Sequence, residues 1–139
     1  MHTLGHERGT AALPRQVKLR TWLDRLVRTA AERDALDDPQ AQLELARALI
    51  GVEVLRHHAY RTVGEFLNGG AVGPDSSSVK LLMAEAEQRL AASAFEILGP
   101  EDEFWTEIYL YSRAASVYGG TQQIQRNIIA DRILALPQE

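Results

Sequence analysis

Apolar residues recur three and four positions apart along almost the whole of this 139-residue chain. Such spacing places apolar side chains on one face of an α-helix, whereas the strict alternation of a strand is essentially absent. The strongest breaks in the pattern are Pro39, the run from Gly69 to Pro74, and Gly99-Pro100. The pattern therefore predicts an all-α fold in which long helices are joined by short connections.

The expected helices follow from these breaks. The first covers about residues 3–32, with Pro14 as a kink or an internal start. The second begins at Pro39, with Asp38 as N-cap, and ends at Gly69-Gly70; its apolar face is wide enough to predict burial on more than one side. Three further helices are expected from residue 75 or 76 to Gly99, from Phe104 to Val117 and from Thr121 to Leu134, the last with Ile124, Ile128, Ile129 and Ile133 on one side.

Short connections between long helices favour antiparallel neighbours. We therefore expect an antiparallel up-down four-helix-type bundle with a short additional C-terminal helix, formed by residues 1–139 as a single domain.

Composition excludes several classes of protein. The net charge of −4 argues against a nucleic-acid partner, and the chain has no cysteine for disulfides or thiolate metal sites. No apolar run approaches the roughly 20 residues that a bilayer span needs. The expectation is a cytoplasmic protein without a membrane or metal site. Basic residues gather in the first 33 positions, and we interpret them as a solvated helix face rather than a phosphate-binding stripe.

The most informative segment runs from Tyr118 through Gly119-Gly120-Thr121 to Asn127. Adjacent glycines let the backbone approach a ligand closely, and the N–H groups at the start of the following helix point at the same place. Such a corner suits a phosphate or a developing oxyanion, although ordinary turns use the same residues.

The whole string from Tyr118 to Pro137 resembles the C-terminal signature of acyl-CoA dehydrogenases. The resemblance covers nearly the whole of this chain. Within the family, the matching part is only the C-terminal helical domain. Its further segments are Leu4 to Gly9, Gly73 to Ser77, Val79 to Leu82 and Ile97 to Pro100.

The resemblance implies oxidation of an acyl-CoA to its 2-enoyl form, a step of lipid and fatty acid metabolism. A carboxylate removes the α-proton, and FAD accepts the β-hydrogen as hydride. Many members carry the base directly after the signature tyrosine, where this chain has Gly119. In other branches the base lies on the first helix, which matches Glu7 here. Read without the resemblance, Glu7 is a carboxylate that only interacts with the helix dipole.

The resemblance also assigns binding residues. Gly5, His6, Arg8 and Tyr118 would line the substrate site, and the N–H groups of Gly119 and Gly120 would face the thioester oxygen. FAD would contact Thr121, Gln122, Gln123 and Arg33. Thr121 is equally suited to be a helix N-cap, and the two roles are compatible.

Two elements depart from the family. Where the family has an Arg-x-x-Phe-Gly turn, this chain keeps only the arginine, as Arg33. Where the family has a Gln-x-x-Gly-Gly element, which contacts FAD across a dimer interface, this chain has the segment from Glu96 to Pro100. The N-terminal helical and middle β domains of the family are not part of this sequence. We therefore expect a fragment, a truncated gene product or a subunit that relies on another chain, and we expect the chain alone to be inactive. The expected partners are acyl-CoA, electron-transfer flavoprotein, and a second copy or a further dehydrogenase chain. The alternative is a helical association module without chemistry.

Overall fold

The structure is a computed structural model that describes the backbone of residues 3–70 and 75–137 and, within these ranges, the side chains from residue 12 onward. All regular structure in these ranges is helical, as predicted. The elements are α1 (Thr3–Glu32), η1 (Ala35–Asp37), α2 (Pro39–Leu67), α3 (Asp75–Leu98), α4 (Glu103–Ser112), η2 (Arg113–Ser116) and α5 (Gln122–Arg132).

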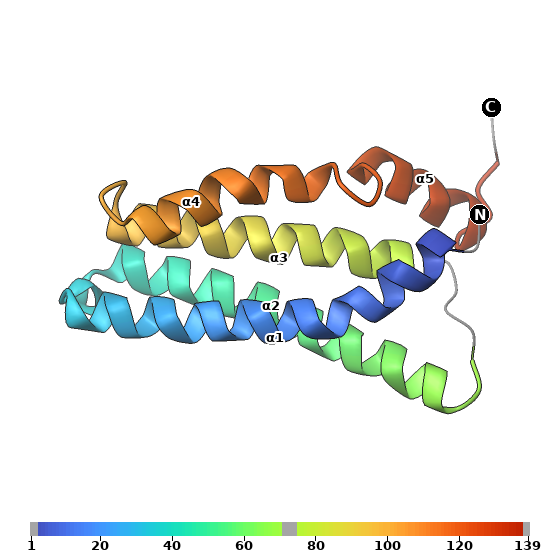
Figure 1. Ribbon diagram of the computed structural model, residues 1–139, viewed down its shortest axis with the longest axis horizontal. Helices are drawn as coiled ribbons and strands as arrows, with labels where there is room; N and C mark the ends of the chain where they lie inside the picture. Colours follow the sequence, from blue (N-terminus) through green and yellow to red (C-terminus); the bar gives the residue numbers. More distant parts are fainter. Residues whose placement is uncertain (1–2, 71–74, 138–139) are drawn as a thin grey trace.

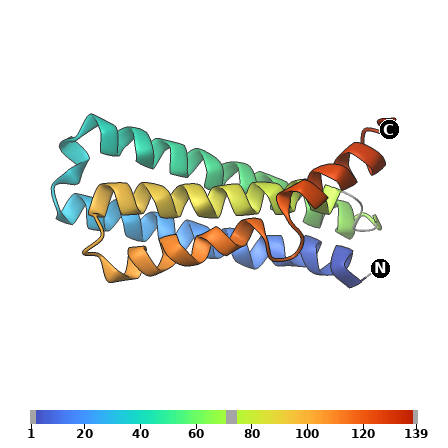
Figure 2. The same cartoon turned by 90° about the horizontal axis from the view of Figure 1, so that it is seen from above.

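The first four α-helices run up and down in alternation, and α5 follows η2 at the end of the bundle where α1 begins (Figures 1 and 2). Helix α3 lies in the middle and contacts α1, α2, α4 and α5. The core accordingly gathers around it, and its fully buried members include Leu19, Leu26, Val52, Leu55, Leu90 and Trp105.

Local chemistry explains the helix starts. Asp38 accepts a hydrogen bond from the Gln40 N–H at 2.9 Å, and Pro39 occupies the first helical position, as predicted. Helix α1 continues through Pro14 without interruption. Figure 1 shows its first turns rising out of the line of the rest, which fits the kink expected where a proline removes a backbone donor.

The fourth predicted helix changes type before Val117. Helix α4 ends at Ser112, and a 3₁₀ segment follows over Arg113–Ser116. The Ser112 hydroxyl donates to the Tyr109 carbonyl at 2.7 Å, and the Arg113 N–H bonds the Leu110 carbonyl, three residues back. Because a side chain competes for the helical acceptor, the last turn tightens.

Two predicted apolar faces are only partly buried. On α5 the buried residue is Gln125, while Ile124 remains 50% exposed, Ile133 is exposed, and Ile128 and Ile129 are half-buried. On α2 one face packs inward, but Leu43, Leu49, Ile50 and Val54 are exposed. The described part of the chain therefore buries α2 on one side only, and the predicted burial on more than one side is not seen within it.

Candidate functional site

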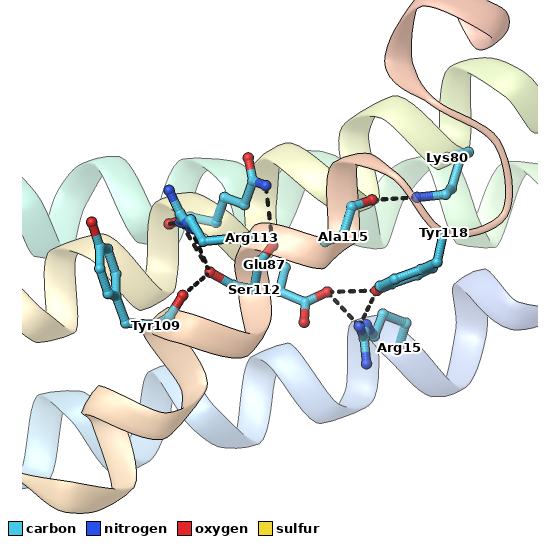
Figure 3. A network of polar contacts seen from close by, with 9 residues as sticks. Arg15, Lys80, Glu87, Tyr109, Ser112, Arg113, Ala115 and Tyr118 are labelled. Carbon is cyan, nitrogen blue, oxygen red and sulfur yellow. Dashed lines mark hydrogen bonds and ion pairs between the residues drawn. The ribbon is translucent and has the colours of Figure 1, made fainter.

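Residues Tyr118 to Thr121 form a corner that joins η2 to α5, and we call it the Gly-Gly corner. It lies over the first half of α3 and beside α1 (Figure 3). Gly119 and Gly120 have φ values of +67° and +101°, which side-chain-bearing residues avoid. The sequence motif therefore corresponds to a backbone shape that depends on glycine.

The Tyr118 hydroxyl ends in a cluster of charged side chains. Glu87, from α3, accepts hydrogen bonds from Arg15 at 2.5 Å and from the Tyr118 hydroxyl at 3.2 Å, and Arg15 also donates to that hydroxyl. Burial raises the pKa of Tyr118 above its ordinary value, and the Glu87 carboxylate adds to this effect. The hydroxyl is thus kept protonated as a donor.

Lys80 holds the other side of the same ring. Its ammonium lies 4.6 Å from the centre of the Tyr118 ring and donates to the Ala115 carbonyl at 2.6 Å. A Cβ on Gly119 would lie 3.2 Å from Lys80 Cε. The buried Lys80 therefore links η2 to the Gly-Gly corner and leaves little room for a side chain at position 119.

Gln125, from α5, fixes the glycines themselves. Its fully buried amide donates to the Gly119 carbonyl at 3.1 Å and to the Gly120 carbonyl at 3.4 Å. A Cβ on Gly120 would meet Gln125 Nε2 at 2.5 Å. Among the described residues, the N–H groups of Gly119 and Gly120 have no backbone acceptor.

Thr121 is the N-cap of α5, since its hydroxyl accepts from the Ile124 N–H at 3.3 Å. Its hydroxyl proton remains able to donate. Gln122 and Gln123 are the first two helical residues and are at least partly exposed. These three residues therefore stand together at the positive end of α5.

An open cleft of about 480 Å³ lies next to the charged cluster. Tyr118 and Arg15 form one part of its wall, and the other lining residues are Pro14, Lys18, Met83 and Tyr111. The cleft thus combines apolar surface with two cationic side chains, and the tyrosine before the glycine pair faces it.

The predicted residues Gly5, His6, Glu7 and Arg8 belong to the first turns of α1, and their side chains lie outside the described residues. Their backbone can still be related to the corner. Glu7 precedes Arg15 by eight residues, or about 12 Å along a helix axis, and Arg15 bonds Tyr118. The start of α1 and the start of α5 lie at the same end of the bundle (Figures 1 and 2).

Arg33 is not brought to the Gly-Gly corner. It follows the other end of α1, where it pairs with Asp102 at 2.7 Å and donates to the Leu98 carbonyl at 3.3 Å. Arg33 follows Arg15 by 18 residues, or about 27 Å of helix. Arg33 therefore lies in a second region, beside the segment from Glu96 to Pro100, and the flavin contact predicted for it stays a prediction.

Sequence reasoning missed the residues that hold the corner: Arg15, Lys80, Glu87 and Gln125. One signal was present for Glu87, because it lies four residues after Met83 and three before Leu90, on the apolar face of α3. A charged residue on such a face indicates a buried ion pair or a site.

In the described ranges no group of three histidine or acidic side chains is arranged to hold a metal ion. Within the same ranges no helix has the length and apolar character needed to cross a bilayer.

Residues 1–134 match the family model described as acyl-CoA dehydrogenase, C-terminal domain. The chain belongs to the acyl-CoA dehydrogenase family and corresponds to its C-terminal helical domain. The predicted family is thereby confirmed.

Two curated relatives carry the name acyl-CoA dehydrogenase IpdE1. The protein from Mycobacterium tuberculosis is 39% identical over 150 aligned positions, and that from Mycolicibacterium smegmatis is 35% identical over 147. Both alignments take in the whole of this chain but only 38% and 36% of the relatives. The chain thus spans little more than a third of their length.

Solved structures agree on the fold. The Tcur3481-Tcur3483 steroid ACAD G363A variant superposes with a TM-score of 0.85 at 19% identity, over 98% of this chain and 39% of that one. A glutaryl-coenzyme A dehydrogenase in complex with glutaryl-CoA superposes with a TM-score of 0.84 at 24% identity, over 96% of this chain and 36% of that one. At such identities the likeness establishes the helical architecture alone.

Proposed function

We propose that this chain forms the helical wall of a FAD-dependent acyl-CoA dehydrogenase site, which oxidises an acyl-CoA to the 2-enoyl-CoA. The observation that supports this most is the Gly-Gly corner. It combines glycine backbone, N–H groups without a backbone acceptor among the described residues, and a helix start, at the end of the bundle where α1 begins.

The thioester oxygen would be bound by main-chain donors. A trans peptide unit is planar, so its N–H points opposite to its C=O. Because Gln125 binds the Gly119 and Gly120 carbonyls, the N–H groups of Gly120 and Thr121 point away from Gln125. This geometry favours these two groups as oxyanion donors, beside the Gly119 N–H expected from the sequence.

Glu7 would take the α-proton. A carboxylate enclosed by an apolar acyl chain and a flavin loses hydration, which raises its pKa toward the working pH and makes it an effective base. Gly5, His6 and Arg8 belong to the same two turns of α1 and would line the substrate beside it.

The residues at the start of α5 fit part of a flavin nucleotide. The Thr121 hydroxyl and the side-chain amides of Gln122 and Gln123 suit phosphate and ribose oxygens at a helix N-terminus, and Arg33 would serve the second region. Bound FAD would supply the hydride acceptor. The family resemblance extends the proposal to electron-transfer flavoprotein as the electron acceptor and to association with a second copy or a further dehydrogenase chain in the cytoplasm.

A chimaera tests the function. This chain would replace the matching C-terminal third of the M. tuberculosis relative, expressed with any subunit that this relative requires, and acyl-CoA-dependent reduction of a dye would be measured. We expect turnover, and we expect Glu7→Gln to lower it by at least about 10²-fold, the scale of a lost general base, while the flavin stays bound.

Glu32→Gln is the matched control, since Glu32 is an exposed carboxylate at the far end of the same helix. Wild-type turnover in the Glu7→Gln chimaera would show that the base lies elsewhere. A folded, colourless chimaera would favour the alternative of a helical association module.

A further inference from the structure

Glu87 is a carboxylate in the core of the bundle. Its side chain is 1% exposed and shares the buried face of α3 with Met83 and Leu90. Removing a carboxylate from water is costly unless partners compensate, and apolar replacements of buried ion pairs are often as stable or more so. Core packing alone therefore does not account for glutamate at this position.

The contacts of Glu87 all lead toward the Gly-Gly corner. Its Oε2 accepts from both Arg15 and Tyr118, while its Oε1 is buried without a partner among the described residues. Arg15 in turn donates to the same tyrosine hydroxyl. The two charged groups thus converge on one atom of Tyr118, as Figure 3 shows.

Tyr118 is the residue directly before the two glycines. Glycine has more backbone freedom than any other residue, so a Gly-Gly pair keeps one shape only when its flanks are anchored. Gln125 anchors the carbonyls from the α5 side. On the other side, the anchor is the Tyr118 ring, held at its face by Lys80 and at its hydroxyl by the Arg15 and Glu87 pair.

We propose that Glu87 is a positioning residue, which acts with Arg15 through the Tyr118 hydroxyl to hold Gly119 and Gly120 in the orientation that the thioester site needs. The effect of Glu87 on the Gly119 and Gly120 backbone is inferred from contacts within this chain. Only the effect on substrate binding rests on the proposed function.

Nuclear magnetic resonance of the 139-residue chain tests the positioning. In Glu87→Gln we expect the backbone amide signals of Gly119 and Gly120 to shift or broaden and the pKa of Tyr118 to fall, because a nearby negative charge is lost. Glu85→Gln is the matched control, an exposed carboxylate on the same helix, and should change neither. Unchanged glycine signals in Glu87→Gln would overturn the proposal.

A double mutant separates this route from a general disturbance of α3. Tyr118→Phe removes the hydroxyl and should by itself reproduce the glycine changes. Adding Glu87→Gln to Tyr118→Phe should then have little further effect, because the two residues act in series. Full additivity of the two changes would show that Glu87 does not act through Tyr118.

The active chimaera tests the last step. There Glu87→Gln should raise KM for the acyl-CoA several-fold, with a smaller change in kcat and unchanged flavin content, while Glu85→Gln leaves all three unaltered. Unchanged KM in an active chimaera would contradict the role in substrate positioning. A chimaera without turnover would contradict the proposed function and would leave the resonance result standing.

Discussion

Gly119 and Gly120 differ in what surrounds them, although both have positive φ. A Cβ on Gly120 would lie only 2.5 Å from Gln125 Nε2, whereas a Cβ on Gly119 would lie 3.2 Å from Lys80 Cε. The second glycine is therefore the more demanding of the two, since a contact of 2.5 Å forces the buried Gln125 amide to move, whereas a contact of 3.2 Å needs only a small shift of Lys80.

A pair of alanine substitutions tests this difference. Gly119→Ala should cost about 1–2 kcal/mol of stability, the penalty for a side chain in left-handed backbone. Gly120→Ala should cost more, because it also displaces Gln125 and its two hydrogen bonds, each worth about 1 kcal/mol. Urea unfolding monitored by circular dichroism measures both. Equal losses in the two variants would contradict the assigned role of Gln125.

Residue-level prediction from the sequence was uneven for physical reasons. The string from Tyr118 to Thr121 is local, so its turn chemistry could be read directly. The partners of the Tyr118 hydroxyl could not be predicted in this way, because Arg15 lies 103 residues from Tyr118 and 72 residues from Glu87 in the chain. The spacing of residues shows which side chains share a face of one helix, but it does not show which helix that face packs against.

At the level of elements, α2 and α3 are joined by a buried polar contact. The Ser93 hydroxyl donates to Glu44 at 2.9 Å, and Arg47 pairs with the same carboxylate at 2.7 Å. The hydrogen bond from Ser93 is the main cause that holds the pKa of Glu44 below its ordinary value, with Arg47 adding to it and burial opposing.

The pH dependence of Ser93→Ala follows from this shift. A lowered folded-state pKa gives stability that is present above the unfolded value of about 4.3 and lost as pH falls through the folded value. Ser93→Ala should therefore cost about 1–3 kcal/mol at pH 7, and the difference from wild type should shrink below about pH 4. Thermal unfolding between pH 3 and pH 7 measures it.

The control is Ser78→Ala, a half-buried serine on the same helix without a hydrogen bond to the described residues. It should change stability little at any of these pH values. A Ser93→Ala deficit that stays constant across the range would refute the link to Glu44 ionisation.

Helix positions were predicted better than helix faces. Glycine, proline and capping residues act locally, so the starts of α1, α2 and α3 and the end of α3 lie within a residue of the expected positions. Beyond the local competition by Ser112, the 3₁₀ segment Arg113–Ser116 is also held by Lys80, which reaches from α3 to the Ala115 carbonyl. Tertiary contacts of this kind leave no local signal.

For the whole molecule, the proposed flavin contacts fall into two regions at opposite ends of the bundle, the Gly-Gly corner and the region of Arg33 and Asp102. Neither region encloses a ligand on all sides within the described chain. The exposed apolar residues of α2, among them Leu43, Ile50 and Val54, likewise indicate surface that other domains or chains would cover.

We therefore predict that the isolated 139-residue chain binds little FAD and oxidises no acyl-CoA, whereas the chimaera retains stoichiometric flavin. The reason is that each region supplies only part of a site. Absorbance between 350 and 500 nm after gel filtration, read against protein concentration, measures the flavin content. Turnover by the chain alone would overturn the prediction.

The central place of α3 has a consequence for how sequences of this kind can diverge in length. From this one helix, Lys80 contacts η2, Glu87 contacts the Gly-Gly corner, Ser93 contacts α2 and the Leu98 carbonyl contacts Arg33 in the turn after α1. Each residue inserted into or deleted from an α-helix rotates everything beyond it by about 100°. A single insertion near the middle of α3 would break these contacts together, so alignment gaps between related chains should fall after α2 or between α3 and α4 and spare α3.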